Sequence, residues 1–202
     1  GQAAARLFVE EGARVVLVDL DEAALQKAAD VIGNDRVSSV VADVTTLEDT
    51  QRFMKAAVDR HGRIDVFLAN AGIEGVSKPL QEYPLDVFDR VWAVNVRGVF
   101  LGLQHVIPIM SEQGGGSIVI TSSVFGYKGG VGSSVYSASK HAVIGLMRSA
   151  AMECAPLGIR VNTINPAYID GAMMQRVVDA ADPDASQQLR ERLQRQVPLA
   201  RY

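Results

Sequence analysis

Ser133-Ser134-Val135-Tyr136-Ser137-Ala138-Ser139-Lys140, preceded by Ser122-Ser123, is the stretch on which the interpretation of the whole chain depends. Tyr136 and Lys140 are four residues apart, so on a helix their side chains share one face. A nearby cation favours the phenolate and brings a tyrosine closer to useful strength as a base. Ser123 follows the apolar run 117–121, which is typical of a buried strand. A hydroxyl at the carboxyl end of that strand and a tyrosine on the next helix can converge on one substrate oxygen.

Outward from this stretch, helical periodicity and short apolar runs alternate along the chain. The pattern predicts helices at 2–11, 22–32, 45–60, 84–110 and 135–155, and buried strands at 14–19, 37–42, 64–69, 117–121 and 159–164. Such alternation is typical of βαβ units, so we expect an α/β fold with a doubly wound parallel sheet. Pro108 should kink or shorten the long fourth helix. Residues 1–202 form one predicted domain, and the polar segment 171–198 is either a substrate lid or a solvated charged face.

Composition argues against several classes of partner. The chain has 20 Lys and Arg against 23 Asp and Glu, and a net charge of −3 offers no basic field for nucleic acid or an anionic membrane. No uninterrupted apolar run approaches the ~18 to 20 residues of a membrane span, and the first residues lack the layout of a secretory signal. We therefore expect a cytoplasmic protein. Cys154 is the only cysteine and the histidines are scattered, so neither an internal disulfide nor a metal site is expected.

Five ordered motifs resemble those of the short-chain dehydrogenase/reductase family, and the resemblance covers nearly the whole chain. They are Asn70-Ala71-Gly72, Asn95-Val96-x-Gly98, Ser123, Tyr136-x-x-x-Lys140 and Asn165-Pro166. The resemblance implies a Rossmann-like fold and an oxidoreductase that transfers a hydride between NAD and a secondary alcohol or ketone. It implies that Tyr136 is the general acid and base and that Lys140 lowers the pKa of Tyr136 and holds the nicotinamide ribose. Ser123 would bind the substrate oxygen, and Asn95 would support a proton relay through a bound water.

The same resemblance implies cofactor contacts where the predicted strands end. They are Asp19, Leu20, Asp43, Val44, Asn70, Ala71, Gly72, Tyr136, Lys140, Pro166 and Ile169. A carboxylate at Asp19 would accept hydrogen bonds from ribose hydroxyls and repel a 2′-phosphate, which favours NAD over NADP. The residues by themselves leave other interpretations open: Asp19 could cap the following helix, Asp43 could be a turn residue, and Asn95 could serve packing.

The chain departs from the family pattern in two places. Gly171 stands where the family commonly has a threonine, so no hydroxyl assists the backbone of Ile169 in clamping the nicotinamide carboxamide. The chain also opens at what resembles the last glycine of the family's glycine-rich loop and stops before its final helix and strand. We therefore expect a fragment whose sheet lacks the first, central strand. We expect that such a fragment alone would neither fold stably nor hold a dinucleotide.

The substrate, the partners and the alternatives follow from the same residues. The mouth of the pocket is predicted to be mostly apolar, which favours a neutral alcohol or ketone, although Lys78, Lys128 or Arg176 could reach an anionic group. Its predicted lining is Phe125, Tyr127, Val131, Tyr168, Met173 and Met174. By family likeness, the long helices at 85–110 and 135–155 imply a homo-oligomer, either a tetramer or a dimer. The alternatives are an NADPH-dependent 3-oxoacyl reductase, a catalytically silent dinucleotide-binding regulator and an unrelated α/β protein.

Overall fold

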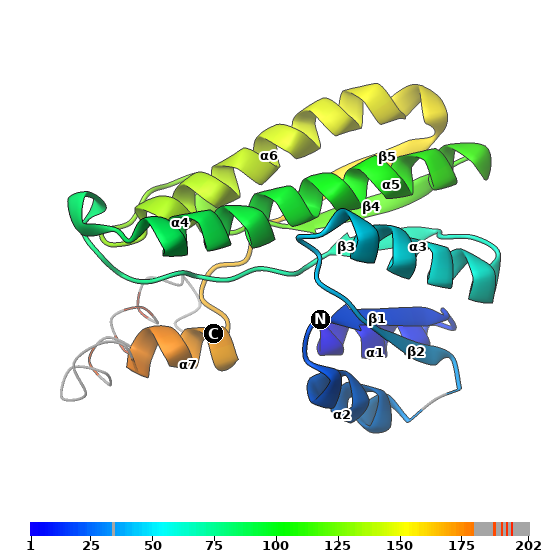
Figure 1. Cartoon of the computed structure of the whole chain (residues 1–202), viewed down its shortest axis with the longest axis horizontal. Coiled ribbons are helices and arrows are strands. Elements are labelled where there is room, and N and C mark those ends of the chain that lie inside the picture. Colours follow the sequence, from blue (N-terminus) through cyan, green and yellow to red (C-terminus); the bar gives the residue numbers. More distant parts are fainter. Residues whose placement is uncertain (34, 180–187, 189–190, 192, 194, 196–202) are drawn as a thin grey trace.

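The computed structural model describes residues 1–33 and 35–179 together with residues 188, 191, 193 and 195 (Figure 1). Helices and strands alternate in these residues, as the sequence predicts. The helices are α1 (Gln2–Glu10), α2 (Glu22–Ile32), α3 (Leu47–His61), α4 (Leu85–Trp92), α5 (Gly98–Glu112), α6 (Ser134–Cys154) and α7 (Ala172–Asp179). The strands are β1 (Val15–Asp19), β2 (Val37–Val41), β3 (Val66–Ala69), β4 (Gly116–Thr121) and β5 (Ile159–Ile164). Short 3-10 turns lie at Leu80–Glu82, Val124–Gly126 and Ala155–Leu157.

The strands form two parallel sheets. β1 pairs with β2, and β4 lies between β3 and β5 (Figure 1). The parallel pairing confirms the predicted α/β, Rossmann-like fold. Among the described residues no strand lies against the second edge of β1 or of β3, in keeping with a sheet that lacks a central strand.

Local capping explains why the helices on the β1–β2 side begin and end where they do. The Asp21 side chain accepts a hydrogen bond from the backbone N–H of Ala24 at the start of α2, at 3.0 Å. Thr46 accepts one from the N–H of Asp49 at the start of α3, at 3.2 Å. Gly62 ends α3 with a positive φ of 76°, which glycine adopts without steric cost.

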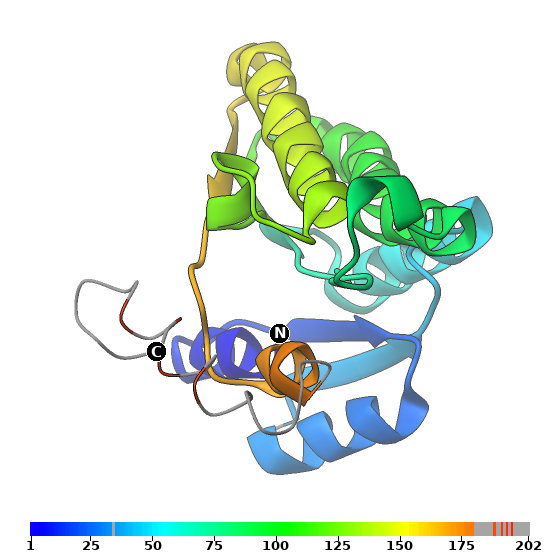
Figure 2. The ribbon, with the colours of Figure 1, turned by 90° about the vertical axis from the view of Figure 1, so that its left-hand side faces the viewer.

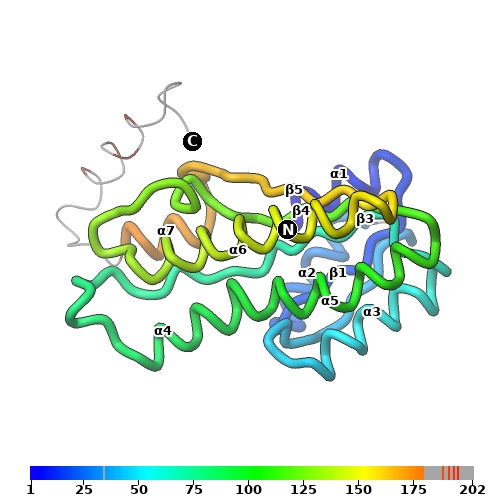
Figure 3. The backbone as a smooth tube through the Cα atoms, turned by 90° about the horizontal axis from the view of Figure 1, so that it is seen from above, coloured from blue at the N-terminus to red at the C-terminus, as the bar shows by residue number. Residues whose placement is uncertain are grey.

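The hydrophobic core lies between the β3–β5 sheet and the two long helices. α5 and α6 run side by side over one face of this sheet, and α3 lies beside α5 (Figures 2 and 3). Side chains with no measurable exposure include Val106 and Met110 of α5, Val143 of α6, and Ile118 and Ile120 of β4. This packing fixes the end of β4 and the start of α6, which carry the serine and tyrosine of the predicted site.

The helix from Leu85 to Glu112 differs from expectation in where it is interrupted. It passes through Pro108 and ends at Glu112, whereas a π-helical turn over Ala93–Arg97 separates α4 from α5. Asn95 lies in that turn and is 1% exposed. By length and composition alone this helix could cross a membrane. Its apolar residues Val99 and Val106 nevertheless lie in the core described above.

α7 begins the segment predicted as a lid. Its buried residues Met174 and Val178 pack with Leu193 and with Tyr168, which lies on the connection from β5. Most of the predicted lid, from residue 180 onward, lies outside the described residues.

Candidate active site

The polar residues that the sequence places after the strands gather at one edge of the fold. Asp19 ends β1, Asp43 follows β2, and Asn70 follows β3. The Thr121 hydroxyl at the end of β4 donates a hydrogen bond to Oδ1 of Asn70 at 3.1 Å, which joins the ends of two strands. The carboxyl edge of a parallel sheet is where ligands bind in open α/β folds.

Ser123, Tyr136 and Lys140 meet at this edge. Nζ of Lys140 lies 5.6 Å from the centroid of the Tyr136 ring and donates a hydrogen bond to the carbonyl oxygen of Thr121 at 2.9 Å. The Ser123 hydroxyl lies close enough to the Tyr136 phenol to lower the pKa of the phenol by hydrogen bonding. The structure therefore brings together the three side chains singled out by spacing.

Burial dominates the electrostatics of this cluster. The pKa of Tyr136 is raised, first by desolvation and then by the negative charge of Glu74, while the hydrogen bond with Ser123 lowers it. Burial also lowers the pKa of Lys140 to about 8. The pKa of Tyr136 is therefore raised, whereas the spacing of the two residues suggests that Lys140 lowers it. There are two physical reasons. The Lys140 ammonium donates its hydrogen bond to the Thr121 carbonyl, and burial disfavours the charged form of Lys140.

Asn95 connects the segment after β3 to α6 through hydrogen bonds. Its Oδ1 accepts a hydrogen bond from the N–H of Ile73 at 2.8 Å, and its Nδ2 donates to the Ile73 carbonyl at 2.9 Å and to Oγ of Ser139 at 3.0 Å. Ser139 in turn donates to the carbonyl oxygen of Tyr136 at 2.7 Å. Asn95, which lies in the π-helical turn, thus holds the backbone on both sides of the site.

Two neighbouring serines have separate functions in the structure. Ser122 donates its hydroxyl hydrogen to the carbonyl oxygen of Lys140 at 3.0 Å and is 2% exposed, so it fixes α6 against β4. Ser123 accepts a hydrogen bond from the N–H of Phe125 at 3.2 Å, and its own hydroxyl lies 3.5 Å from the carbonyl oxygen of Pro166. Ser123 is the one that reaches Tyr136.

The backbone at Gly72 lies close to the side chains of this cluster. A Cβ atom at this position would lie 3.3 Å from Nζ of Lys140 and 3.4 Å from Oδ1 of Asn95. Gly98 is similarly restricted, because a Cβ there would lie 2.9 Å from a methyl group of Val44. A side chain at Gly98 would therefore displace Val44, a packing partner of the long helix, whereas one at Gly72 would lie in tight contact with Lys140 and Asn95.

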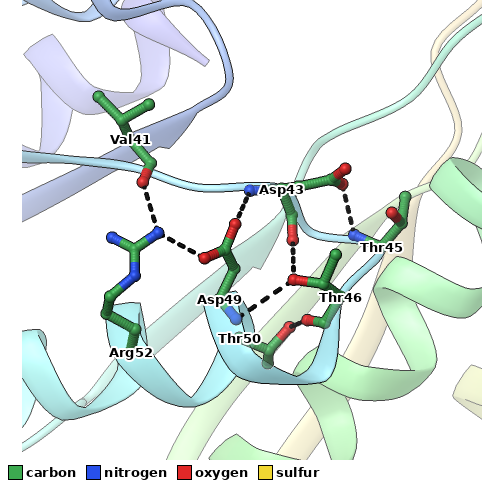
Figure 4. Close-up of polar contacts among 7 residues, drawn as sticks. All are labelled: Val41, Asp43, Thr45, Thr46, Asp49, Thr50 and Arg52. Carbon is green, nitrogen blue, oxygen red and sulfur yellow. Dashed lines mark hydrogen bonds and ion pairs between the residues drawn. The ribbon is translucent and has the colours of Figure 1, made fainter.

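The predicted residues on the β1–β2 side are partly engaged in local turns. Asp19 is exposed and accepts a hydrogen bond from the N–H of Asp21 at 3.2 Å, and Leu20 is 64% exposed. Asp43 accepts a bond from the N–H of Thr45 at 2.8 Å, and its own N–H donates to Asp49 at 2.6 Å (Figure 4). Asp43 therefore has the turn geometry considered in the sequence analysis.

The substrate side of Tyr136 carries part of the predicted apolar lining. The Phe125 ring packs edge-on against Tyr136 and against Tyr168, with centroid distances of 6.0 and 6.5 Å. Tyr127 and Val131 are exposed instead. Ile169 is 60% exposed. Among the described residues no group of three or more His, Cys, Asp or Glu side chains is placed to hold a metal ion.

Sequence reasoning missed Glu74. This carboxylate lies two residues beyond Gly72 and pairs with Arg176 of α7 at 2.5 Å (Nε to Oε1) and 3.1 Å (Nη2 to Oε2). Its negative charge raises the pKa of Tyr136. The only sequence signal was its place directly after the Asn-Ala-Gly motif, and nothing local indicates a partner 102 residues away.

Comparisons with known proteins agree with this geometry. The family model for short chain dehydrogenases matches residues 1–182. Levodione reductase of Leifsonia aquatica is 39% identical over 206 residues, which cover all of this chain and 77% of the relative. A crystal structure of levodione reductase superposes with a TM-score of 0.95 at 37% identity, covering all of this chain and 80% of that one. A crystal structure of NAD⁺-bound xylitol dehydrogenase superposes with a TM-score of 0.93 at 34% identity, with coverages of 100% and 82%. The chain therefore belongs to the short-chain dehydrogenase/reductase family of oxidoreductases.

Proposed function

We propose that this protein transfers a hydride between NAD and a secondary alcohol or ketone, with Tyr136 as the general acid and base. The main support for the proposal is that the side chains of Ser123, Tyr136 and Lys140 lie close together at the carboxyl edge of the sheet. The xylitol dehydrogenase and levodione reductase relatives support a polyol or cyclic ketone as the type of substrate.

The residues at this edge fit a nicotinamide dinucleotide. The N-terminus of α1 lies beside Asn70, since a Cβ on Gly1 would be 3.5 Å from Nδ2 of Asn70, and a helix N-terminus suits a diphosphate. The exposed carboxylate of Asp19 is suited to ribose hydroxyls and would repel a 2′-phosphate, which favours NAD over NADP. Gly72 leaves room for close approach next to Lys140. When bound, the dinucleotide supplies the hydride acceptor or donor.

The side chains handle the proton. In the oxidation direction Tyr136 accepts the hydroxyl proton of the alcohol, and in reduction it returns that proton to the carbonyl oxygen. Ser123 donates a hydrogen bond to the same oxygen as negative charge develops there. Lys140 would hold the nicotinamide ribose. Asn95 fixes the backbone of Ile73 and keeps both walls of the site at their observed separation.

A cofactor-coupled screen of alcohols and ketones with a Tyr136→Phe variant tests the proposal. Because the phenol is the only proposed proton carrier to substrate, we expect Tyr136→Phe to lose activity by about 10²- to 10⁴-fold. We expect turnover to be faster with NAD than with NADP, and Asp19→Ala to narrow that preference. Full activity in Tyr136→Phe would show that Tyr136 is not the general acid and base, whereas dinucleotide binding by the wild type without turnover of any substrate would favour a dinucleotide-binding regulator. Turnover confined to acyl thioesters with NADPH would favour the 3-oxoacyl reductase.

We also propose a homo-oligomer in which a second copy covers an apolar groove on the outer side of the long helices. The groove is lined by Asp89, Trp92, Ala93, Val96, Arg97, Phe100 and Leu146. Phe100 is a large apolar side chain yet 47% exposed. The groove carries both an acidic and a basic residue, so two copies related by a two-fold axis can present opposite charges to each other.

For location, we propose the cytoplasm. The single cysteine, Cys154, is buried and can form no internal disulfide, which suits a reducing compartment. Cell fractionation followed by detection of the protein tests this placement, and recovery in a membrane or secreted fraction would contradict it.

A further inference from the structure

The ion pair between Glu74 and Arg176 joins the connection after β3 to α7. The guanidinium contacts both carboxylate oxygens, Nε with Oε1 and Nη2 with Oε2, which is the fork geometry that arginine forms with carboxylates. The two partners differ in exposure: the Glu74 side chain is 19% exposed and the Arg176 side chain 58%. The carboxylate is therefore the more enclosed partner, and the guanidinium approaches it from the solvent side.

The chain segment that carries Glu74 is anchored on both sides. Asn95 bonds the N–H and the carbonyl of Ile73, the residue before it. The Tyr83 hydroxyl accepts a hydrogen bond from the N–H of Val76 at 3.3 Å, two residues after it. Gly75 has a φ of +73°, and a Cβ there would lie 2.3 Å from the Tyr83 hydroxyl. Glu74 thus has little freedom to move away from Tyr136.

Arg176 stands on α7, which also reaches Tyr136 by a second route. Met174 and Val178 of α7 pack with Tyr168, whose ring contacts Phe125, and Phe125 contacts Tyr136. α7 is therefore attached on one side through aromatic rings and on another through the ion pair.

Two charged groups act on or lie close to Tyr136, and two more contact its neighbours. Glu74 approaches from the connection after β3 and raises the pKa of Tyr136, and Lys140 approaches from α6. Lys128 lies 5.9 Å from the centroid of the Phe125 ring, and Arg176 acts through its contact with Glu74. Arg176 therefore determines how strongly the Glu74 charge is felt at the phenol.

We propose that the Glu74–Arg176 pair makes the enzyme specific for neutral alcohols and ketones. The pair places a carboxylate, neutralised by its arginine, at the substrate side of Tyr136. Because Arg176 is already paired with Glu74, it is not available to bind an anionic substrate. The inference rests on the proposed function, because it names the substrate class of that same site. Glu74 and Arg176 are positioning residues, since they act through the phenol and through α7.

The test compares a neutral ketone substrate with an analogue that carries a carboxylate, using Glu74→Gln and Arg176→Gln. In Glu74→Gln the guanidinium is released, so we expect kcat/KM for the anionic analogue, relative to the neutral one, to rise by about tenfold. In Arg176→Gln the enclosed carboxylate of Glu74 is left unpaired. We therefore expect the ratio of kcat/KM for the anionic analogue to that for the neutral ketone to fall. The basic limb of the pH profile of kcat/KM should also move to higher pH. Arg176→Lys should restore the wild-type profile in part, and the double variant Glu74→Gln/Arg176→Gln should bring the limb back towards lower pH.

Titration of Tyr136 by ¹³Cζ NMR separates this inference from the proposed function. The signal is assigned by its loss in Tyr136→Phe, and its titration requires no turnover. The phenol should titrate at higher pH in Arg176→Gln and at lower pH in Glu74→Gln. Lys55→Gln is the matched control, because it also breaks an exposed pair, Lys55–Asp59 on α3, with the same loss of charge. Identical Tyr136 titrations and substrate ratios in wild type, Glu74→Gln and Arg176→Gln would overturn the inference even if the enzyme is active.

Discussion

At the scale of single residues, Lys140 is the buried charge with the largest consequence for stability. It is 4% exposed, its ammonium donates a hydrogen bond to the Thr121 carbonyl, and burial lowers its pKa from 10.5 to about 8. A lysine whose pKa is depressed on folding destabilises the protein fully below the folded pKa. Between about pH 8 and 10.5 the unfolded chain binds more protons than the folded one, so this penalty is relieved as the pH rises.

Lys140→Met removes this titration and provides a prediction. We expect the free energy of unfolding of the wild type, relative to Lys140→Met, to increase from pH 7.5 to pH 10.5 by on the order of 3 kcal/mol at most. Urea unfolding of both proteins at the two pH values, without cofactor, measures the difference. Lys55→Met, which removes an exposed lysine, should show no such pH-dependent difference. If the free energy of unfolding changed by the same amount between the two pH values in Lys140→Met and in the wild type, the prediction would be wrong.

Sequence predicted the members of this cluster but not their electrostatic balance. Spacing along one strand and one helix places Ser123, Tyr136 and Lys140 together, because both elements are regular. The direction of the Tyr136 pKa depends on enclosure and on Glu74, which a linear pattern does not contain. Asp43 illustrates the same limit, since its turn hydrogen bonds are visible only in the folded chain.

At the scale of elements, helix ends were predictable and the interruption of the long helix was not. Asp21, Thr46, Gly33 and Gly62 cap helices through bonds to residues three or four positions away, so the sequence contains both partners. The π-helical turn at Asn95 instead satisfies a residue on another element, Ile73. Pro108 was expected to disturb the helix, but α5 continues past it to Glu112.

A π-helical turn is equivalent to one residue inserted into an α-helix, which yields a prediction at this scale. Deleting Val96 should restore α-helical pairing with α4 and α5 close to their present orientation, and should remove the bulge from which Asn95 reaches Ile73. We expect circular dichroism to retain its helical signal while kcat/KM falls by about 10²-fold, because the walls of the site are no longer held in register. Val96→Ala is the control that keeps the length. Undiminished activity in the deletion variant would show that the turn has no role in the site.

At the scale of the whole molecule, the outer side of α4, α5 and α6 carries the groove proposed as a subunit interface. Phe100→Glu places a charge in the lining of this groove, so we expect a lower molar mass by light scattering than for the wild type. Val31→Glu, at an exposed valine on α2, is the matched control and should leave the mass unchanged. An unchanged mass in Phe100→Glu would place the interface elsewhere.

The general architecture followed from sequence because alternating strands and helices allow few arrangements. What could not be predicted are contacts between residues far apart, such as Glu74 with Arg176 across 102 positions. The packing of α7 under Tyr168 is of the same kind. In the proposals above, such contacts determine the substrate side of the site, whereas the motifs determine its chemistry.

Among the residues that the structure describes, β1 and β3 each have one edge with no strand paired to it, which has one further consequence. A row of unpaired backbone N–H and C=O groups is a template on which another extended chain can add. Val15–Asp19 and Val66–Ala69 contain neither lysine nor proline, the residues that discourage such pairing. Unless another segment shields these strands, β-type aggregation in concentrated solution will compete with orderly assembly through the helices.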